Sequence, residues 1–302
     1  MRMHKKLLDI LGILAACTAA WTAGCDETLQ SAGSQSPAAS VQAKAAQTNV
    51  GGPMPFRDAS ALADRQAAEI TGDTPEDIQM RQQFRQAVID LLSSPDAETR
   101  RESAEMLGVL HKKHALSALT LAVDDPDAKV QEAAILAIAC IGEKTVAGQI
   151  ATKLNSPQIR VRAAAAKTLG RLATPKTTGA LISALKDSSA DVRESAARAL
   201  GPLHEQESIE PLIRALRDAD PKVRAAAAGS LGIMQAPQAV PPLIKTLKDP
   251  YAQVRYLAAG ALGNLGDKSA LPALASLRND SDIAVRNMAE AAISKLRGPK
   301  KP

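Results

Sequence analysis

Residues 177–207 read TTGALISALKDSSADVRESAARALGPLHEQE, and the stretches that follow repeat this pattern. Residues 208–238 read SIEPLIRALRDADPKVRAAAAGSLGIMQAPQ and residues 239–269 read AVPPLIKTLKDPYAQVRYLAAGALGNLGDKS, so the copies start 31 residues apart. A fixed period of this size is typical of repeat architectures. Seven copies follow one another without insertion, and they start at Phe84, Ala115, Val146, Thr177, Ser208, Ala239 and Ala270.

Each copy predicts a pair of antiparallel helices. Leu181, Ile182 and Leu185 have helical spacing, and a polar turn separates them from a second helical pattern that begins at Val192. The turns place an oxygen-bearing side chain just ahead of the second helix, where it can cap free backbone N–H groups. These predicted caps are Asp127, Ser189, Asp220 and Asp282.

One column of small residues predicts how the pairs stack. The twentieth position of the copies reads Ser103, Ala134, Ala165, Ala196, Ala227, Ala258 and Ala289. Small side chains allow helices to cross closely, and aromatic residues make up only 2% of the chain. The sequence therefore predicts an all-α fold, an α-solenoid of about seven helical hairpins that forms a curved, right-handed superhelical rod.

The copies resemble HEAT repeats, in a short bacterial form similar to the repeats of phycobilin lyases. The resemblance rests on a leucine-rich first helix, an aspartate, a short turn, Val-Arg, small residues and Leu-Gly, and it covers residues 84–297. It implies a ladder formed by the aspartate and the arginine six residues later. The expected pairs are Asp187 with Arg193, Asp218 with Arg224, Asp249 with Arg255, and Asp280 with Arg286.

The ladder residues are incomplete in the early copies. Ser94 and Ser156 replace the aspartate, and Gln131 replaces the arginine. In the last copy a shift of one residue in the first helix makes Asp282 an alternative to Asp280.

The N-terminus has the pattern of a secretory signal, with Arg2, Lys5 and Lys6 ahead of an apolar stretch. The residues before Cys25 resemble the bacterial lipobox, which implies lipid attachment at Cys25, and Cys17 is the alternative site. We therefore expect an exported protein that is lipid-anchored to a bacterial membrane and faces the periplasm. The predicted division is a signal peptide at 1–24, a flexible tether at 25–55, a helical cap at 56–83, the repeats at 84–297 and a basic tail at 298–302.

The charge argues against a nucleic-acid partner. Removal of residues 1–24 takes away three basic residues and Asp9, so the formal net charge falls from +5 to +3. A weakly basic chain with few aromatic residues lacks the features that bind phosphates and stack on bases.

No catalytic or metal-binding constellation stands out, so we expect a protein that is not an enzyme and needs no cofactor. His111 and His114 are three residues apart without an evident acidic or thiol ligand, and Cys140 is interpreted as a small apolar residue on a helix. Deoxyhypusine hydroxylases are similar repeat proteins that bind iron through several His-Glu pairs, but this chain has one such pair, His204-Glu205.

The second helices are expected to line the concave side of the rod, with the eighteenth and twenty-second positions exposed. There Glu194 and Arg198 give way to Ala225, Gly229, Tyr256 and Gly260. We interpret Glu194, Arg198 and Tyr256 as candidate contacts for a protein or peptide partner of a monomeric scaffold, although Tyr256 can also pack on the neighbouring helix. The alternatives are a repeat-protein enzyme, as a lyase or hydroxylase, and a purely architectural envelope protein.

Overall fold

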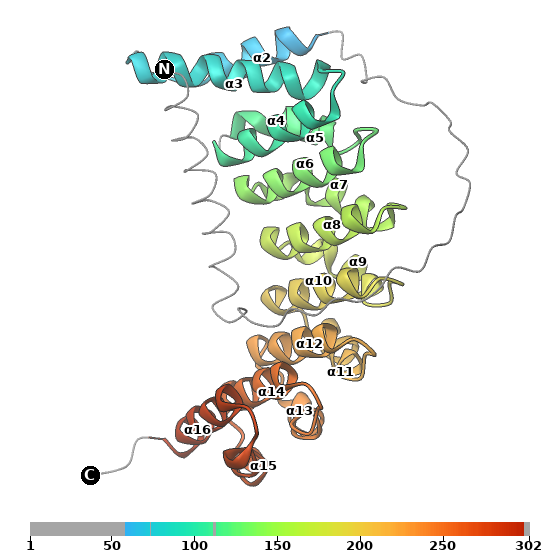
Figure 1. The fold of residues 1–302 in the computed structure, drawn as a ribbon, viewed down its shortest axis with the longest axis vertical. Coiled ribbons are helices and arrows are strands. Elements are labelled where there is room, and N and C mark those ends of the chain that lie inside the picture. The colour runs from blue at the N-terminus through green and yellow to red at the C-terminus, as the bar shows by residue number, and fades with distance from the viewer. Residues whose placement is uncertain (1–57, 73, 111–112, 299–302) are drawn as a thin grey trace. The chain divides into compact units, whose positions relative to one another are not determined.

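The computed structural model describes residues 58–72, 74–110 and 113–298, and this part of the chain contains helices and no strand. The predicted signal peptide, Cys17, Cys25 and the tether lie outside the described residues. Figure 1 shows helix pairs stacked one upon another, with first helices on one side and second helices on the other. The all-α repeat fold is therefore confirmed, whereas the handedness of the superhelix stays a prediction.

Seven first helices and seven second helices alternate along residues 75–297. The first helices are α3 (Pro75–Ser93), α5 (Leu116–Ala122), α7 (Ala147–Thr152), α9 (Thr178–Ala184), α11 (Ile209–Ala215), α13 (Val240–Thr246) and α15 (Leu271–Ser276). The second helices are α4 (Ala97–Val109), α6 (Ala128–Ile141), α8 (Ile159–Leu172), α10 (Ala190–Leu200), α12 (Pro221–Ile233), α14 (Ala252–Leu265) and α16 (Ile283–Arg297).

A further helix, α2 (Ala59–Ala68), precedes the pairs and packs on α3. Single 3-10 turns join the pairs or extend their helices: η1 (Lys113–Ala115), η2 (Lys144–Val146), η3 (Lys153–Asn155), η4 (Pro175–Thr177), η5 (Gly201–Leu203), η6 (Gln206–Ser208), η7 (Pro237–Ala239), η8 (Lys268–Ala270) and η9 (Leu277–Asn279).

Side-chain caps fix where several helices begin. Asp127, Asp220 and Asp282 accept backbone hydrogen bonds at the starts of α6, α12 and α16, as predicted. Ser189 occupies the corresponding position before α10 without a side-chain cap bond. Thr74 begins α3 in a reciprocal capping box with Asp77, with Pro75 at the first helical position.

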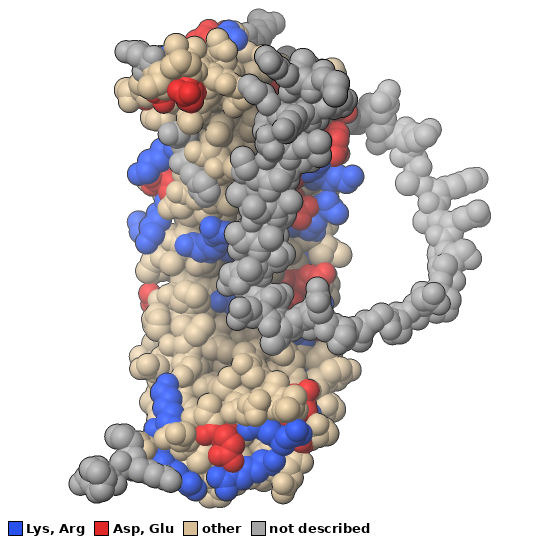
Figure 2. Space-filling view, turned by 60° about the vertical axis from the view of Figure 1, so that its left-hand side comes forward, with Lys and Arg blue, Asp and Glu red and all other residues tan. Residues whose placement is uncertain are grey.

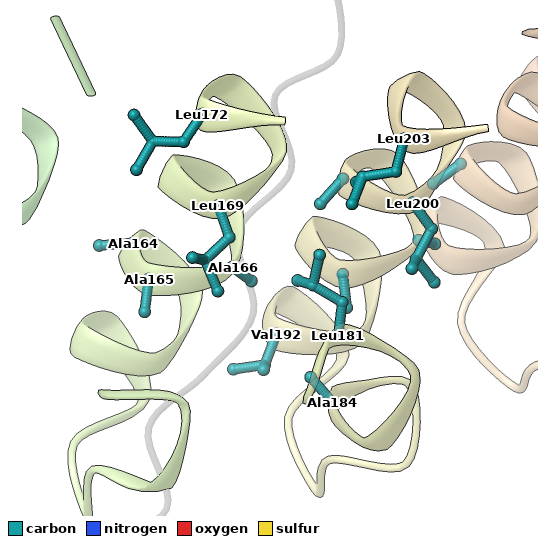
Figure 3. Close-up of a cluster of buried hydrophobic side chains, with 14 of the residues drawn as sticks. Ala164, Ala165, Ala166, Leu169, Leu172, Leu181, Ala184, Val192, Leu200 and Leu203 are labelled. Atoms are coloured by element: carbon teal, nitrogen blue, oxygen red, sulfur yellow. The ribbon is translucent and has the colours of Figure 1, made fainter. Parts of the chain in front are cut away.

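The core runs along the stack between the two layers of helices. Leu169 of α8, Leu181 of α9 and Leu200 of α10 are fully buried, and Figure 3 shows how leucines and alanines from successive pairs share one apolar layer. The alanines of the predicted column from Ala134 to Ala289 are fully buried, which confirms that column. Each pair therefore covers its apolar faces with its neighbours, as expected for a solenoid.

The closest crossings of successive second helices occur at a glycine column that the alanine column did not predict. A Cβ added to Gly170 would lie 2.7 Å from the Cα of Ala199, and one added to Gly232 would lie 2.7 Å from the Cα of Ala261. Gly108, Gly201 and Gly263 make equivalent approaches to the next pair.

The two layers are not equally tight. Successive second helices contact one another extensively, whereas successive first helices lie further apart and contact mainly their own partners. Because the second helices approach more closely, the second-helix face is the concave one.

Candidate functional site

A ladder of arginine–aspartate pairs links successive repeats. The guanidinium of Arg193 donates two hydrogen bonds to the carboxylate of Asp218, both at 2.8 Å. Equivalent two-bond pairs join Arg100 to Asp125, Arg162 to Asp187, Arg224 to Asp249 and Arg255 to Asp280. Paired contacts of this kind fix geometry as well as charge, so each rung sets the register between two repeats.

The pairing differs from the one expected within a copy. Arg193 does contact Asp187, six residues earlier, but its Nη1 donates to the backbone oxygen of Asp187 at 2.9 Å. The Asp187 carboxylate instead accepts from Arg162 of the preceding copy. The same correction applies to Asp218 with Arg224, Asp249 with Arg255 and Asp280 with Arg286. Each arginine therefore bridges its own turn and the carboxylate 25 residues further on, because the long side chain reaches across the stacking interface.

The early departures from the pattern also have a geometric cause. Gln131 and Ser156 occupy the two sides of one interface, so a single rung is lost where two residues differ. The Gln131 side chain retains the contact to its own turn by donating to the Asp125 backbone oxygen at 2.6 Å. Asp280 remains the ladder residue of the last copy, and Asp282 caps α16.

The environment of the rungs shifts the pKa of their carboxyl groups. Burial acts to raise the pKa of Asp218, but hydrogen bonds from Arg193 and from the Asp220 backbone N–H outweigh it, so the pKa is lowered. Asp187 and Asp249 follow the same balance, and the pKa of Asp280 is lowered chiefly by its bond from Arg255. These charges stabilise the stack and are not free to carry chemistry.

Glu194 and Arg198 form one ion pair on the second-helix face. They lie one turn apart on α10, with Arg198 Nη2 3.0 Å from the Glu194 carboxylate. The Arg198 side chain is 58% exposed, so a partner can reach it.

Tyr256 lies on α14, where it is half-buried and packs against the core. Ala225 on α12 is buried and cannot line the face, which corrects its expected exposure. Gly229 does lie at the surface, where an added Cβ would meet only the Leu257 side chain, at 3.9 Å. Gly260 lies beside Met288 in the same way.

The second-helix face has a band without charged side chains. Figure 2 shows Lys, Arg, Asp and Glu in its upper half and at its lower end, with a charge-free zone between. Beyond their ladder arginines, α12 and α14 carry no charged residue. Ile233, which is 48% exposed, adds a large apolar side chain at the end of α12. We define the apolar band as Gly229, Ile233, Tyr256, Leu257, Gly260 and Met288.

The other candidate residues are not brought together. His114 contacts Glu69 of the preceding helical segment, His204 and Glu205 lie between η5 and η6, and Cys140 is half-buried in α6. His111 lies outside the described residues. Among the residues that the structure describes, no group of three or more His, Cys, Asp and Glu is placed to hold a metal ion. None of the helices in that part of the chain is long and apolar enough to cross a bilayer.

Comparison with known proteins identifies the repeats. A family model described as HEAT repeats matches residues 56–139, 116–201, 149–217, 178–252 and 240–302. The YibA protein of E. coli is 23% identical over a structural match that covers 85% of this chain and 99% of that chain, with a TM-score of 0.54. No curated protein sequence matches the chain.

Two more distant structures have enzyme names. The CpcE–CpcF complex of phycocyanin lyase from Nostoc is 23% identical and covers 75% of this chain and 96% of that chain, with a TM-score of 0.49. Human deoxyhypusine hydroxylase is 21% identical and covers 82% and 99%, with a TM-score of 0.37. At such identities the likeness extends to the fold alone.

Proposed function

Because the chain belongs to the HEAT-repeat family, we propose that it is a non-enzymatic scaffold that binds a protein or peptide partner along its second-helix face. The observation that carries this proposal is the abrupt change on that face between α10 and α14. Fold stability does not require it, since the ladder and the buried alanines continue unchanged through these repeats. A surface that varies over an unvarying core is expected of a binding face.

The geometry suggests how a partner lies on this face. Its charged segment meets the Glu194–Arg198 pair, and its apolar side chain meets the apolar band. Gly229 leaves room for close approach, while Tyr256 is held by its packing and loses little freedom on binding. Half-buried aromatic residues of this kind are favoured as anchors in interfaces.

The experiment uses a partner captured by crosslinking the protein in its own membrane. We expect Tyr256→Ala to weaken the affinity by about 2 kcal/mol or more, as for a true anchor. Arg198→Glu should mainly slow association and change its dependence on salt. Lys144→Glu, an exposed change in η2, is the control. Equal losses in all three variants, or a loss in none, would exclude this face as the binding site.

We further propose that a lipid at Cys25 holds the scaffold on the periplasmic side of a bacterial membrane. The proposal rests on the lipobox-like residues before Cys25 and on the polar sequence that follows it. Cys25→Ala should abolish incorporation of labelled lipid and release the protein from membranes. Labelling that survives this change and disappears in Cys17→Ala would assign the anchor to Cys17.

A further inference from the structure

A hollow of about 210 Å³ lies between α11 and α13 on the opposite side of the stack from the apolar band. It exists because successive first helices lie further apart than the second helices do. Ile213, Leu216 and Pro242 supply apolar surface, and three cations, Arg217, Lys245 and Lys248, line it as well. Thr246 and Asp249 complete the lining.

The cations of this hollow are not neutralised by its one carboxylate. Asp249 accepts hydrogen bonds from Arg224 at 2.7 and 3.0 Å and from the Tyr251 backbone N–H at 3.0 Å. No ion pair within the described residues involves Arg217, Lys245 or Lys248. Exposed positive charges beside an apolar floor therefore await a counter-charge from another molecule.

The same positions are basic over three consecutive repeats. Lys186, Arg217 and Lys248 are equivalent, and so are Arg214 and Lys245. The equivalent residues of the first three copies are Ser93, Asp124, Asn155, Asp90, Leu121 and Thr152. In the last copy Arg278 is bound by Glu290 at 2.6 Å, so the row of available cations ends there. We define the basic row as Lys186, Arg214, Arg217, Lys245 and Lys248.

We propose that the hollow and the basic row bind an extended acidic segment of a partner protein. The hollow is smaller than the roughly 300–1,000 Å³ of small-molecule sites, so it fits one apolar side chain better than a free ligand. Packed helices are spaced by roughly 8–10 Å, and an extended peptide advances about 3.3 Å per residue. Acidic residues at every third position therefore match the basic row, and an apolar residue between them enters the hollow.

This second site is independent of the proposed second-helix site, because the two lie on opposite layers of the stack. A peptide is favoured over a flat anionic membrane because a bilayer surface presents no side chain to fill the hollow. A membrane contact is instead one outcome of the test.

The test measures binding of a fluorescent peptide to the full chain by anisotropy. The peptide has about twelve residues, enough to span three repeats, with an acidic residue at every third position and a central leucine. We expect Lys245→Glu combined with Lys248→Glu to weaken binding by about tenfold or more. Lys176→Glu combined with Lys268→Glu makes the same change of charge at exposed positions away from the row, and should leave binding within about twofold.

Matched peptides distinguish the site from general attraction. Replacing the central leucine by alanine should weaken binding about fivefold, because the hollow then loses its apolar contact. A peptide of the same composition with its acidic residues gathered at one end should bind more weakly. Equal binding of the regular and gathered peptides, or equal losses in the two double variants, would overturn the proposal. Binding to phosphatidylglycerol vesicles that depends on Lys245 and Lys248, without peptide binding, would also overturn it and assign the row to a membrane.

Discussion

At the scale of single residues, the arginines of the ladder have two tasks. Arg193 fixes its own turn through the Asp187 and Ser188 backbone oxygens and holds the next repeat through the Asp218 carboxylate. Arg286 has only the first task, because no repeat follows it and its guanidinium donates to the Asp280 and Ser281 backbone oxygens. The chain thus contains its own control for the rung.

The two arginines allow the contribution of a rung to be measured. Arg193→Ala leaves the largely buried Asp218 carboxylate without its cation, so we expect a loss of about 2–4 kcal/mol of unfolding free energy, allowing for partial solvent access. Arg286→Ala removes backbone hydrogen bonds alone and should cost about 0.5–1.5 kcal/mol. Urea unfolding measures both. Equal losses would show that the carboxylate contact adds nothing.

The pH dependence of the same two proteins gives an independent reading of the rung. Because the pKa of Asp218 is lowered in the folded state, its stabilisation is present above the unfolded value of about 3.9 and is lost as the pH falls through the folded value. The difference between the unmodified protein and Arg193→Ala should therefore narrow on acidification below about pH 4. A constant difference would argue against an ionic rung.

At the scale of elements, the second helices are positioned by glycines as much as by alanines. The alanine column is buried as the sequence predicts, but the shortest approaches fall five positions later, at Gly108, Gly170, Gly201, Gly232 and Gly263. A signal for this was present in the repeated Leu-Gly of each copy. It was not interpreted as a contact because helical periodicity alone does not show which small residue lies at the crossing.

Two glycines of one helix separate packing from helix propensity. Gly232→Ala places a methyl group 2.7 Å from the Ala261 Cα, and we expect overpacking to cost about 1–3 kcal/mol. Gly229→Ala lies on the same α12 with only Leu257 within reach, at 3.9 Å, and should stabilise the protein by about 0.5–1 kcal/mol. Thermal unfolding compares them. Stabilisation by both substitutions would mean that α12 and α14 do not cross closely.

At the scale of the whole molecule, the repeat order was predictable and the binding surfaces only partly so. The period, the helix pairs and the starts of α3, α6, α12 and α16 follow from apolar spacing and from capping residues that lie next to them in sequence. The partner of each ladder aspartate did not follow, because it depends on how far one copy is displaced against the next. The hollow beside Lys245 and Lys248 depends on the splay of the first helices, for which the sequence has no local signal.

The central claim is that each repeat is held by its neighbours alone, and deletion of residues 177–207 tests it most directly. The deletion brings Arg162 opposite Asp218 and Gly170 opposite Ser230, so the new interface again has a rung and a small pair at the glycine crossing. Circular dichroism of the shortened protein should show the same helical signal per residue and one cooperative thermal transition at a lower temperature. Loss of the helical signal would contradict the account, because it would require contacts between repeats that are not adjacent.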